Sequence, residues 1–78
     1  MIDLKETLSD IARSIVNNPD GVNVTVVEDS NSITLTLNVD ADDMGMVIGR
    51  HGKIAKAIRT VIKAAASGSG KKVNVEIR

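Results

Sequence analysis

The sequence predicts an α+β fold, a three-stranded mixed sheet with three helices on one of its faces. Hydrophobic residues alternate with polar residues in three short segments and recur every three or four residues in two longer segments, which are the periods of strands and helices. The predicted order is helix, strand, strand, short helix, helix and strand. A two-helix crossover thus joins the last two strands, so we expect them to be parallel with a right-handed connection. The length of 78 residues allows one small domain, 1–78.

The first helix is predicted over residues 3–17. Asp3 is a typical N-cap residue, and Glu6 stands three positions later, as in a capping box. Five aliphatic residues at helical spacing form one stripe: Leu4, Leu8, Ile11, Ala12 and Ile15. Pro19, within the segment 17–21, ends the helix because proline cannot continue a helix and restricts the residue before it.

Two strands follow and form a predicted antiparallel hairpin. Valine alternates with Asn and Thr over 22–26, and aliphatic residues alternate with Thr and Asn over 33–39. The Asp-Ser-Asn-Ser connection at 29–32 has the composition of a turn and is short enough to join antiparallel strands. Because one face of the second strand is polar, we expect helices to cover only one side of the sheet. A third alternating segment, 73–77, follows the Gly-Ser-rich loop at 67–70.

Three carboxylates lie close together after the second strand: Asp40, Asp42 and Asp43. They suggest either a divalent-cation site or the capped start of a helix. Capping is favoured, because Asp before a helix accepts its free N–H groups and complements its dipole. The EF-hand pattern is not met, since no bidentate glutamate closes the loop. We therefore expect a short capped helix over 42–48 and no metal site.

Two glycines, Gly49 and Gly52, flank Arg50 and His51 between the two last helices. Glycine adopts backbone angles that other residues avoid, and a turn that opens a helix leaves N–H groups at the positive end of the helix dipole. Arg50 and Lys53 add positive charge at the same place. This combination predicts a phosphate-binding turn. The alternative is that the glycines only connect two helices.

The helix predicted over 52–67 has an apolar and a basic face. The apolar face carries Ile54, Ile58, Val61, Ile62 and Ala65. The basic face carries Lys56, Arg59 and Lys63. At about 100° per residue the apolar arc spans roughly 200°, whereas covering a core needs little more than about 100°. The surplus predicts a two-fold dimer interface that includes Ala57, Val61 and Ala64.

The composition excludes several functional classes. The chain has no Cys, no Phe, Tyr or Trp, and one His. It therefore has no disulfides, no Cys or multi-His metal site and no aromatic platform for stacking bases. No nucleophile–base pair is evident, so we expect no catalytic residues and no cofactor. Without a signal-peptide core or an apolar run of about 18 residues, we expect a cytoplasmic protein that makes no use of a membrane.

Charge is divided between the two halves of the chain, although the formal net charge is zero. Residues 1–43 carry nine acidic and two basic residues, whereas residues 44–78 carry eight basic and one acidic residue. Such asymmetry is a hint of nucleic-acid contact. It is equally compatible with two halves that pair with each other in the fold.

One segment of the sequence is similar to a motif of a known family. It spans residues 42–53 and reads Asp-Asp-Met-Gly-Met-Val-Ile-Gly-Arg-His-Gly-Lys. Together with Ala-Ile-Arg-Thr at 57–60 and Lys-Val-x-Val-x-Ile at 72–77, it resembles the KhpA (YlqC) family of small bacterial KH-domain RNA-binding proteins. The resemblance covers essentially the whole chain and implies a type II KH fold, α-β-β-α-α-β. It also implies a protein that binds single-stranded RNA as a post-transcriptional regulator or RNA chaperone.

By the same resemblance, RNA lies in a groove between the helix pair 42–67 and the sheet, edged by the loop at 67–72. The residues implied in RNA binding are Val47, Ile48, Gly49, Arg50, His51, Gly52, Lys53, Lys56, Lys71 and Lys72. Val47 and Ile48 would form an apolar wall, and the lysines would add charge. Members of the family form homodimers or pair with a larger KH protein of the KhpB/Jag type. The alternative function is therefore that of an interaction subunit that contacts RNA only weakly.

Overall fold

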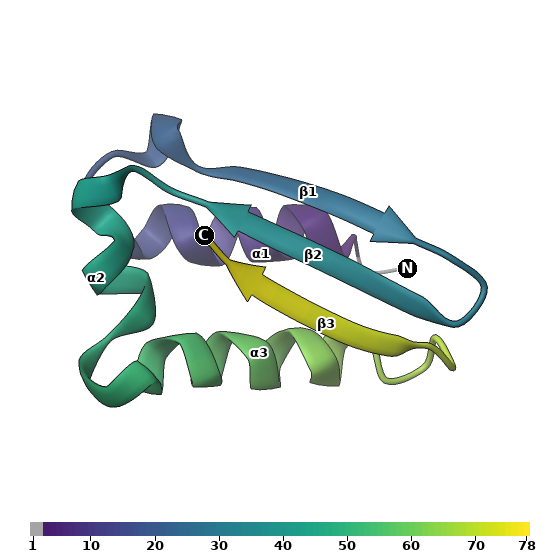
Figure 1. Cartoon of the computed structure of the whole chain (residues 1–78). Helices are drawn as coiled ribbons and strands as arrows, with labels where there is room; N and C mark the ends of the chain where they lie inside the picture. Colours follow the sequence, from purple (N-terminus) through teal and green to yellow (C-terminus); the bar gives the residue numbers. More distant parts are fainter. Residues whose placement is uncertain (1–2) are drawn as a thin grey trace.

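The helices and strands follow one another in the predicted order (Figure 1). The structure is a computed structural model and describes residues 3–78. Its main elements are α1 (Leu4–Ile15), β1 (Asn23–Glu28), β2 (Ser32–Asn38), α2 (Met44–Ile48), α3 (Lys53–Ala65) and β3 (Lys72–Ile77). Single turns of 3-10 helix lie between them at η1 (Pro19–Gly21), η2 (Ala41–Asp43) and η3 (Arg50–Gly52). The predicted α-β-β-α-α-β order is confirmed.

The sheet is mixed, with β2 at its centre. β1 pairs with β2 in the antiparallel direction, and β3 pairs with β2 in the parallel direction, as the arrows in Figure 1 show. Leu35 lies opposite Val26 of β1 and Val75 of β3, so these side chains share one face. Thr34 and Thr36 lie on the other face, which is the polar side that the alternation predicts.

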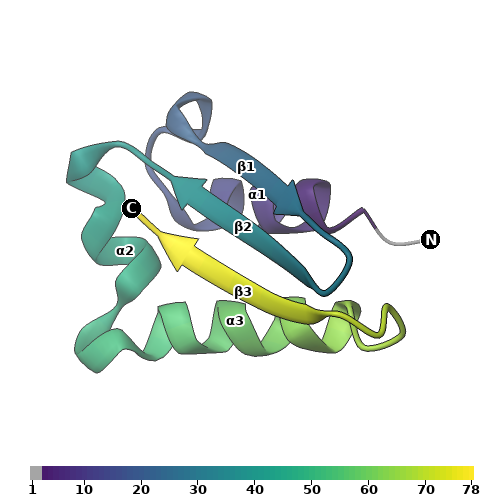
Figure 2. The ribbon, with the colours of Figure 1, turned by 45° about the vertical axis from the view of Figure 1, so that its right-hand side comes forward.

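The core lies between the apolar face of the sheet and the helices. α1 and α3 pack on this face, and α2 stands at the end of the sheet, where it contacts both (Figures 1 and 2). The largest fully buried side chains are Leu8, Leu35, Leu37, Val47 and Ile62. Aliphatic residues alone build this core, so its stability depends on burial area and close packing rather than on aromatic contacts.

The core-facing stripe of α3 is narrower than the predicted apolar face. Ala55, Ile58 and Ile62 are buried, but Ile54 and Val61 are 39% and 49% exposed. At about 100° per residue, Ile54 and Val61 point some 80–100° away from the direction that the three buried residues share. The predicted apolar face is therefore only partly buried, because the sheet lies beneath the Ala55 side of the helix; Val61 lies in the surplus arc that the sequence assigns to a dimer interface.

Two short side-chain caps fix local structure as the sequence suggests. The Asp3 carboxylate accepts a hydrogen bond from the Glu6 N–H at 3.2 Å, which confirms the N-cap of α1. In the hairpin turn, Asp29 Oδ1 accepts from the N–H groups of Asn31 and Ser32, both at 2.7 Å. The Asn31 N–H and then the Ser32 N–H lower the pKa of the Asp29 carboxyl, because they stabilise its charged form.

Asp43 does not cap α2, which corrects the capping prediction for the acidic segment. Neither Asp40 nor Asp43 makes a side-chain capping bond to the helix that follows it. The buried Asp43 carboxylate instead accepts from the N–H groups of Asn17 and Asn18, at 3.2 and 3.1 Å. These two amides follow α1, so Asp43 fastens the end of α1 to the start of α2.

We expect Asp43→Asn to lower the free energy of unfolding by about 2 kcal/mol. Hydrogen bonds to a charged acceptor contribute roughly 1.5–3 kcal/mol, and an amide would turn its own NH₂ toward one of the two backbone donors. Asp42→Asn is the matched control, since Asp42 is exposed; its effect should stay within about 0.5 kcal/mol. Urea unfolding followed by circular dichroism measures both. Equal values for the two variants would contradict the role given to Asp43.

Candidate nucleic-acid interface

The turn between α2 and α3 has an unusual backbone. Gly49 has φ 75° and ψ 174°, His51 has φ 57° and ψ 24°, and Gly52 has φ 74° and ψ 15°. Three of the four residues thus have positive φ, a region that favours glycine and that histidine tolerates better than most residues. The sequence Gly-Arg-His-Gly therefore produces a compact single turn that ends directly at the first residue of α3.

The two glycines have different neighbours. A Cβ on Gly49 would lie 2.3 Å from Ile54 Cγ1 and 3.0 Å from the Ile54 amide nitrogen. Ile54, on the predicted apolar face of α3, packs against the backbone of this turn. A Cβ on Gly52 would meet nothing within 4 Å. Gly49 is thus required by both backbone angle and space, and Gly52 by angle alone.

Positive charge gathers around this turn and is not neutralised locally. Arg50, His51, Lys53 and Lys56 are all exposed. Within residues 3–78, the ion pairs involve none of these four side chains. They lie at the N-terminal end of α3, where free N–H groups and the helix dipole also favour anions. The arrangement can hold a phosphate group by charge and by backbone donors together.

A basic strip continues from the turn along the flank of α3 that faces β3; we define the strip as Lys56, Arg59, Lys63 and Lys72. The Arg59 Nε donates a hydrogen bond to the carbonyl oxygen of Val75 in β3, at 3.2 Å. Lys63 and Lys72 line a shared hollow of about 330 Å³ between the end of α3 and the start of β3. At about 1.5 Å per residue, the 13 residues of α3 form a helix about 20 Å long, of which Lys56 to Lys63 span about 10 Å.

Arg59 was not in the residue set implied by the resemblance. Arg59 lies three positions after Lys56, so both side chains lie on one flank of the helix. This spacing could have identified Arg59 in the sequence as part of the basic strip. The Gly49–Gly52 turn, Lys53 and Lys56 lie together at one end of α3. Lys72 lies at its other end, beside the start of β3 (Figure 1).

The predicted apolar wall is partly wrong. Val47 is 0% exposed and belongs to the core, so its side chain cannot touch RNA. Val47 instead anchors α2 beneath the turn. Ile48, the residue directly before Gly49, is 38% exposed, and its contact with RNA stays a prediction. The wall is therefore reduced to Ile48.

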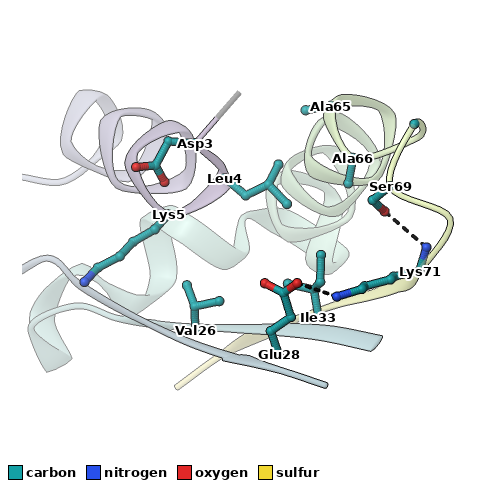
Figure 3. A pocket seen from close by; sticks show the side chains of 11 residues that line it. Asp3, Leu4, Lys5, Val26, Glu28, Ile33, Ala65, Ala66, Ser69 and Lys71 are labelled. Atoms are coloured by element: carbon teal, nitrogen blue, oxygen red, sulfur yellow. Dashed lines mark hydrogen bonds and ion pairs between the residues drawn. The ribbon is translucent and has the colours of Figure 1, made fainter. Parts of the chain in front are cut away.

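Lys71 makes a contact that the sequence did not predict. Its ammonium group forms an ion pair with the Glu28 carboxylate, and only 25% of its side chain is exposed (Figure 3). Both residues border a hollow of about 550 Å³ that Leu4, Val26 and Ile33 line on its apolar side. Lys71 also lines the hollow shared with Lys63 and Lys72. An ion pair with a half-exposed partner is weak, so the RNA contact expected of Lys71 stays a prediction.

The charge asymmetry does not result in two halves that neutralise each other. Among residues 3–78, ion pairs join Arg13 to Asp10, Arg78 to Glu76, and Lys71 to Glu28. Lys71–Glu28 is the pair among these that crosses between the acidic and basic halves. The basic residues of the turn and of α3 therefore remain available to a partner outside the chain.

α3 also carries exposed small and branched apolar residues on the flank opposite the basic strip. Ala57, Val61 and Ala64 are exposed, as the predicted interface requires. We call these three residues the apolar flank. Every helix among residues 3–78 is too short or too polar to cross a lipid bilayer. The same described residues hold no group of three or more His, Cys, Asp or Glu side chains placed to bind a metal ion.

The element order and the turn together define the class of protein. An α-β-β-α-α-β chain with a G-x-x-G turn between its last two helices is a type II KH domain, in which that turn clamps a nucleic-acid backbone. The model of a protein family described as "KhpA/KhpB, KH domain" matches residues 5–77. The chain therefore belongs to the KhpA/KhpB family of KH-domain proteins.

Relatives of similar length support this assignment. A protein of Clostridium perfringens named RNA-binding protein KhpA is 54% identical over 74 residues, which cover 95% of this chain and 99% of the relative. A protein of the same name from Clostridium acetobutylicum is 55% identical over 74 residues, with the same coverage. One from Listeria monocytogenes serovar 1/2a is 42% identical over 74 residues, covering 95% of this chain and 97% of the relative.

Solved structures of Era show the same fold. Era of Aquifex aeolicus bound to GDP.AlF4- aligns with a TM-score of 0.68 and 19% identity, covering 95% of this chain and 29% of the Era chain. Era in complex with MgGDPNP and nucleotides 1506-1542 of 16S ribosomal RNA aligns with a TM-score of 0.64 and 19% identity, covering 95% and 28%. The likeness concerns one part of a longer protein and shows the fold alone.

Proposed function

We propose that the chain is a single KH domain that binds single-stranded RNA and acts as a post-transcriptional regulator or RNA chaperone in the cytoplasm. The observation that carries this proposal is the turn at 49–52, where two positive-φ glycines bring unpaired cations to the N-terminus of α3. The names of the relatives, RNA-binding protein KhpA, agree with it. Without Phe, Tyr or Trp, binding depends on backbone charge rather than on ring stacking.

In this proposal the RNA backbone enters at the turn and follows the basic strip. Arg50 and His51 hold the first phosphates, and Lys53 adds charge beside them. A KH turn clamps about four nucleotides, and the strip offers further cations toward Lys72. The exposed side chain of Ile48 contributes an apolar contact beside the turn.

We expect RNA affinity to fall with salt in a graded way. Neutralising two to four phosphates of a single strand gives a slope of log K against log salt of about −1.5 to −3. Fluorescence anisotropy with a labelled octamer over a range of salt concentrations measures this slope. A slope near zero, or tighter binding to duplex than to single strands, would contradict the KH mode of binding.

The apolar flank of α3 supports a second candidate role, that of an interaction subunit. We propose that this flank pairs with a second copy of the chain, or with a KH protein of the KhpB/Jag type, through Ala57, Val61 and Ala64. All three are exposed, and the two alanines are small enough for another helix to approach closely. Val61, at 49% exposure, supplies the largest apolar side chain of the flank.

We expect Val61→Asp to convert a dimer to a monomer while the domain stays folded. Val61 is half exposed, so the new carboxylate remains in water in the monomer but would be buried at the interface, where an unpaired charge is costly. Thr25→Asp adds the same charge to an exposed position on the polar face of the sheet, which the helices do not cover, and should leave the dimer intact. Analytical ultracentrifugation at tens of micromolar compares them. A monomeric wild type, or a folded Val61→Asp dimer, would refute this interface.

A further inference from the structure

The outer edge of β3 lies directly beside the basic strip. β3 is an edge strand, and the N–H groups of Lys72 and Arg78 donate to Asn31 and Leu37, on the β2 side. Backbone groups of successive strand residues point alternately to the two sides, so those of Val75 point to the open edge. A base bound along the strip would meet this edge.

Arg59 changes what the edge offers to a base. A free carbonyl at Val75 would accept from an amino group, such as N6 of adenine or N4 of cytosine. Val75 already accepts from Arg59 Nε at 3.2 Å. The guanidinium has five N–H donors, of which this contact uses one. Within residues 3–78, the two terminal amino groups of Arg59 make no hydrogen bond or ion pair to a side chain or to the backbone.

The remaining donors have a defined shape. The guanidinium is planar, and its fork of parallel N–H groups matches two adjacent acceptors better than one. On the Hoogsteen edge, guanine is the one base of the four that presents such a pair, O6 and N7; cytosine has a pair, N3 and O2, on its Watson–Crick edge, which the RNA octamer (UC)4 tests. Adenine places a donor beside N7, and uracil presents a single O4 acceptor on that edge. In a single strand this edge is accessible, because the bases are not paired.

We propose that Arg59, held in place by Val75, is a base-selecting residue that makes this chain prefer guanine at one position of the bound RNA. The proposal rests on the proposed RNA-binding function and adds the base that it selects. The turn on one side and Lys63 on the other hold the phosphates, so a base between them lies beside Arg59. Lys63 has no comparable backbone contact among residues 3–78 and acts as a charge alone.

The test uses the full chain and four RNA octamers, U8, (UA)4, (UC)4 and (UG)4, in fluorescence anisotropy at one salt concentration. Wild type should bind (UG)4 at least about fivefold more tightly than (UA)4, as one bidentate contact provides. Replacing guanosine by 7-deazaguanosine removes N7 and should abolish most of the preference. Replacing it by inosine keeps O6 and N7 and should preserve the preference.

Arg59→Lys keeps the charge but removes the planar fork and the Nε donor. It should lower the preference for (UG)4 over (UA)4 below about twofold, with the preference taken as the ratio of the two affinities measured on the same variant. Lys63→Gln is the matched control, because it removes a charge from the same strip. It should weaken binding to all four octamers alike and keep the preference.

Three outcomes would overturn the proposal: wild type without a guanine preference, a preference that survives in Arg59→Lys, or one that is unaffected by 7-deazaguanosine. Each would leave Arg59 with a structural role alone, in which its hydrogen bond to Val75 joins α3 to the edge of β3. Failure of wild type to bind any of the four octamers is a different result, because it refutes the RNA-binding function itself. Circular dichroism of Arg59→Lys confirms that the comparison concerns folded protein.

Discussion

The double variant Arg50→Asp/His51→Asp should lose RNA binding by more than a hundredfold while remaining folded. Both side chains are exposed, and within residues 3–78 neither takes part in an ion pair, so their replacement removes no internal ion pair. Two carboxylates would then stand where phosphate binds. Losing the charge-assisted Arg50 contact, at roughly 2 kcal/mol, and the His51 hydrogen bond, at roughly 1 kcal/mol, gives about 3 kcal/mol, which corresponds to more than a hundredfold in affinity.

Stability should change little in this variant. The new carboxylates lie next to the N-terminus of α3, where negative charge is favourable by roughly 0.3–1 kcal/mol. Aspartate also tolerates the positive φ of His51. Anisotropy with a labelled octamer and thermal unfolding give the two measurements.

A variant with a similar change in net charge elsewhere serves as the control. Lys5→Glu/Arg13→Glu places the acidic residues on the exposed side of α1 and should bind RNA within a fewfold of wild type. If Arg50→Asp/His51→Asp binds as well as this control, the turn is only a helix connector. The role of interaction subunit would then be the better account of the chain.

The two glycines of the turn should differ sharply when each is replaced by alanine. Gly49→Ala should lower the free energy of unfolding by about 3 kcal/mol or more. Its φ of 75° and ψ of 174° lie in a region that is essentially confined to glycine, at a cost of about 1–3 kcal/mol for other residues. The new Cβ would also lie 2.3 Å from Ile54 Cγ1, so Ile54 or the turn must shift.

Gly52→Ala is the matched comparison within the same turn. Gly52 has a left-handed helical backbone, and its Cβ would meet nothing within 4 Å. Only the backbone preference is lost, at a cost of about 1–2 kcal/mol. Urea unfolding of both variants gives the difference. Similar losses for the two would show that the contact with Ile54 does not restrict Gly49.

Short-range patterns predicted the elements and the turn because they depend on neighbours in the sequence. The Asp3 cap, the hairpin and the glycine turn each form within a few residues, and each is present in the structure. The parallel pairing of β2 and β3 followed from a topological rule rather than from contacts. These local and topological signals were sufficient for the fold.

Predictions that depended on distant partners failed for a common reason. Asp43 has the sequence position of a helix cap, yet its donors lie 26 and 25 residues earlier in the chain. The sequence around Lys71 suggests an unpaired cation, yet Lys71 forms an ion pair with Glu28, which is 43 residues away in the chain. The hydrophobic stripe of α3 was wider than the surface it covers, so periodicity did not show that Ala55, rather than Ile54, faces the sheet.

The register of the sheet has a consequence for the rate at which the binding turn forms. In β1 and β2 the pairing begins between Glu28 and Ile33, five positions apart, so the hairpin can close within about 1–10 μs. β2 and β3 pair Ser32 with Lys72, forty positions apart, and this pairing is slower because closing so long a loop costs more conformational entropy. The turn lies within that crossover. Amide hydrogen exchange in α3 and β3 should therefore show one common opening event, and the anion site should appear only in the last, slower phase of refolding.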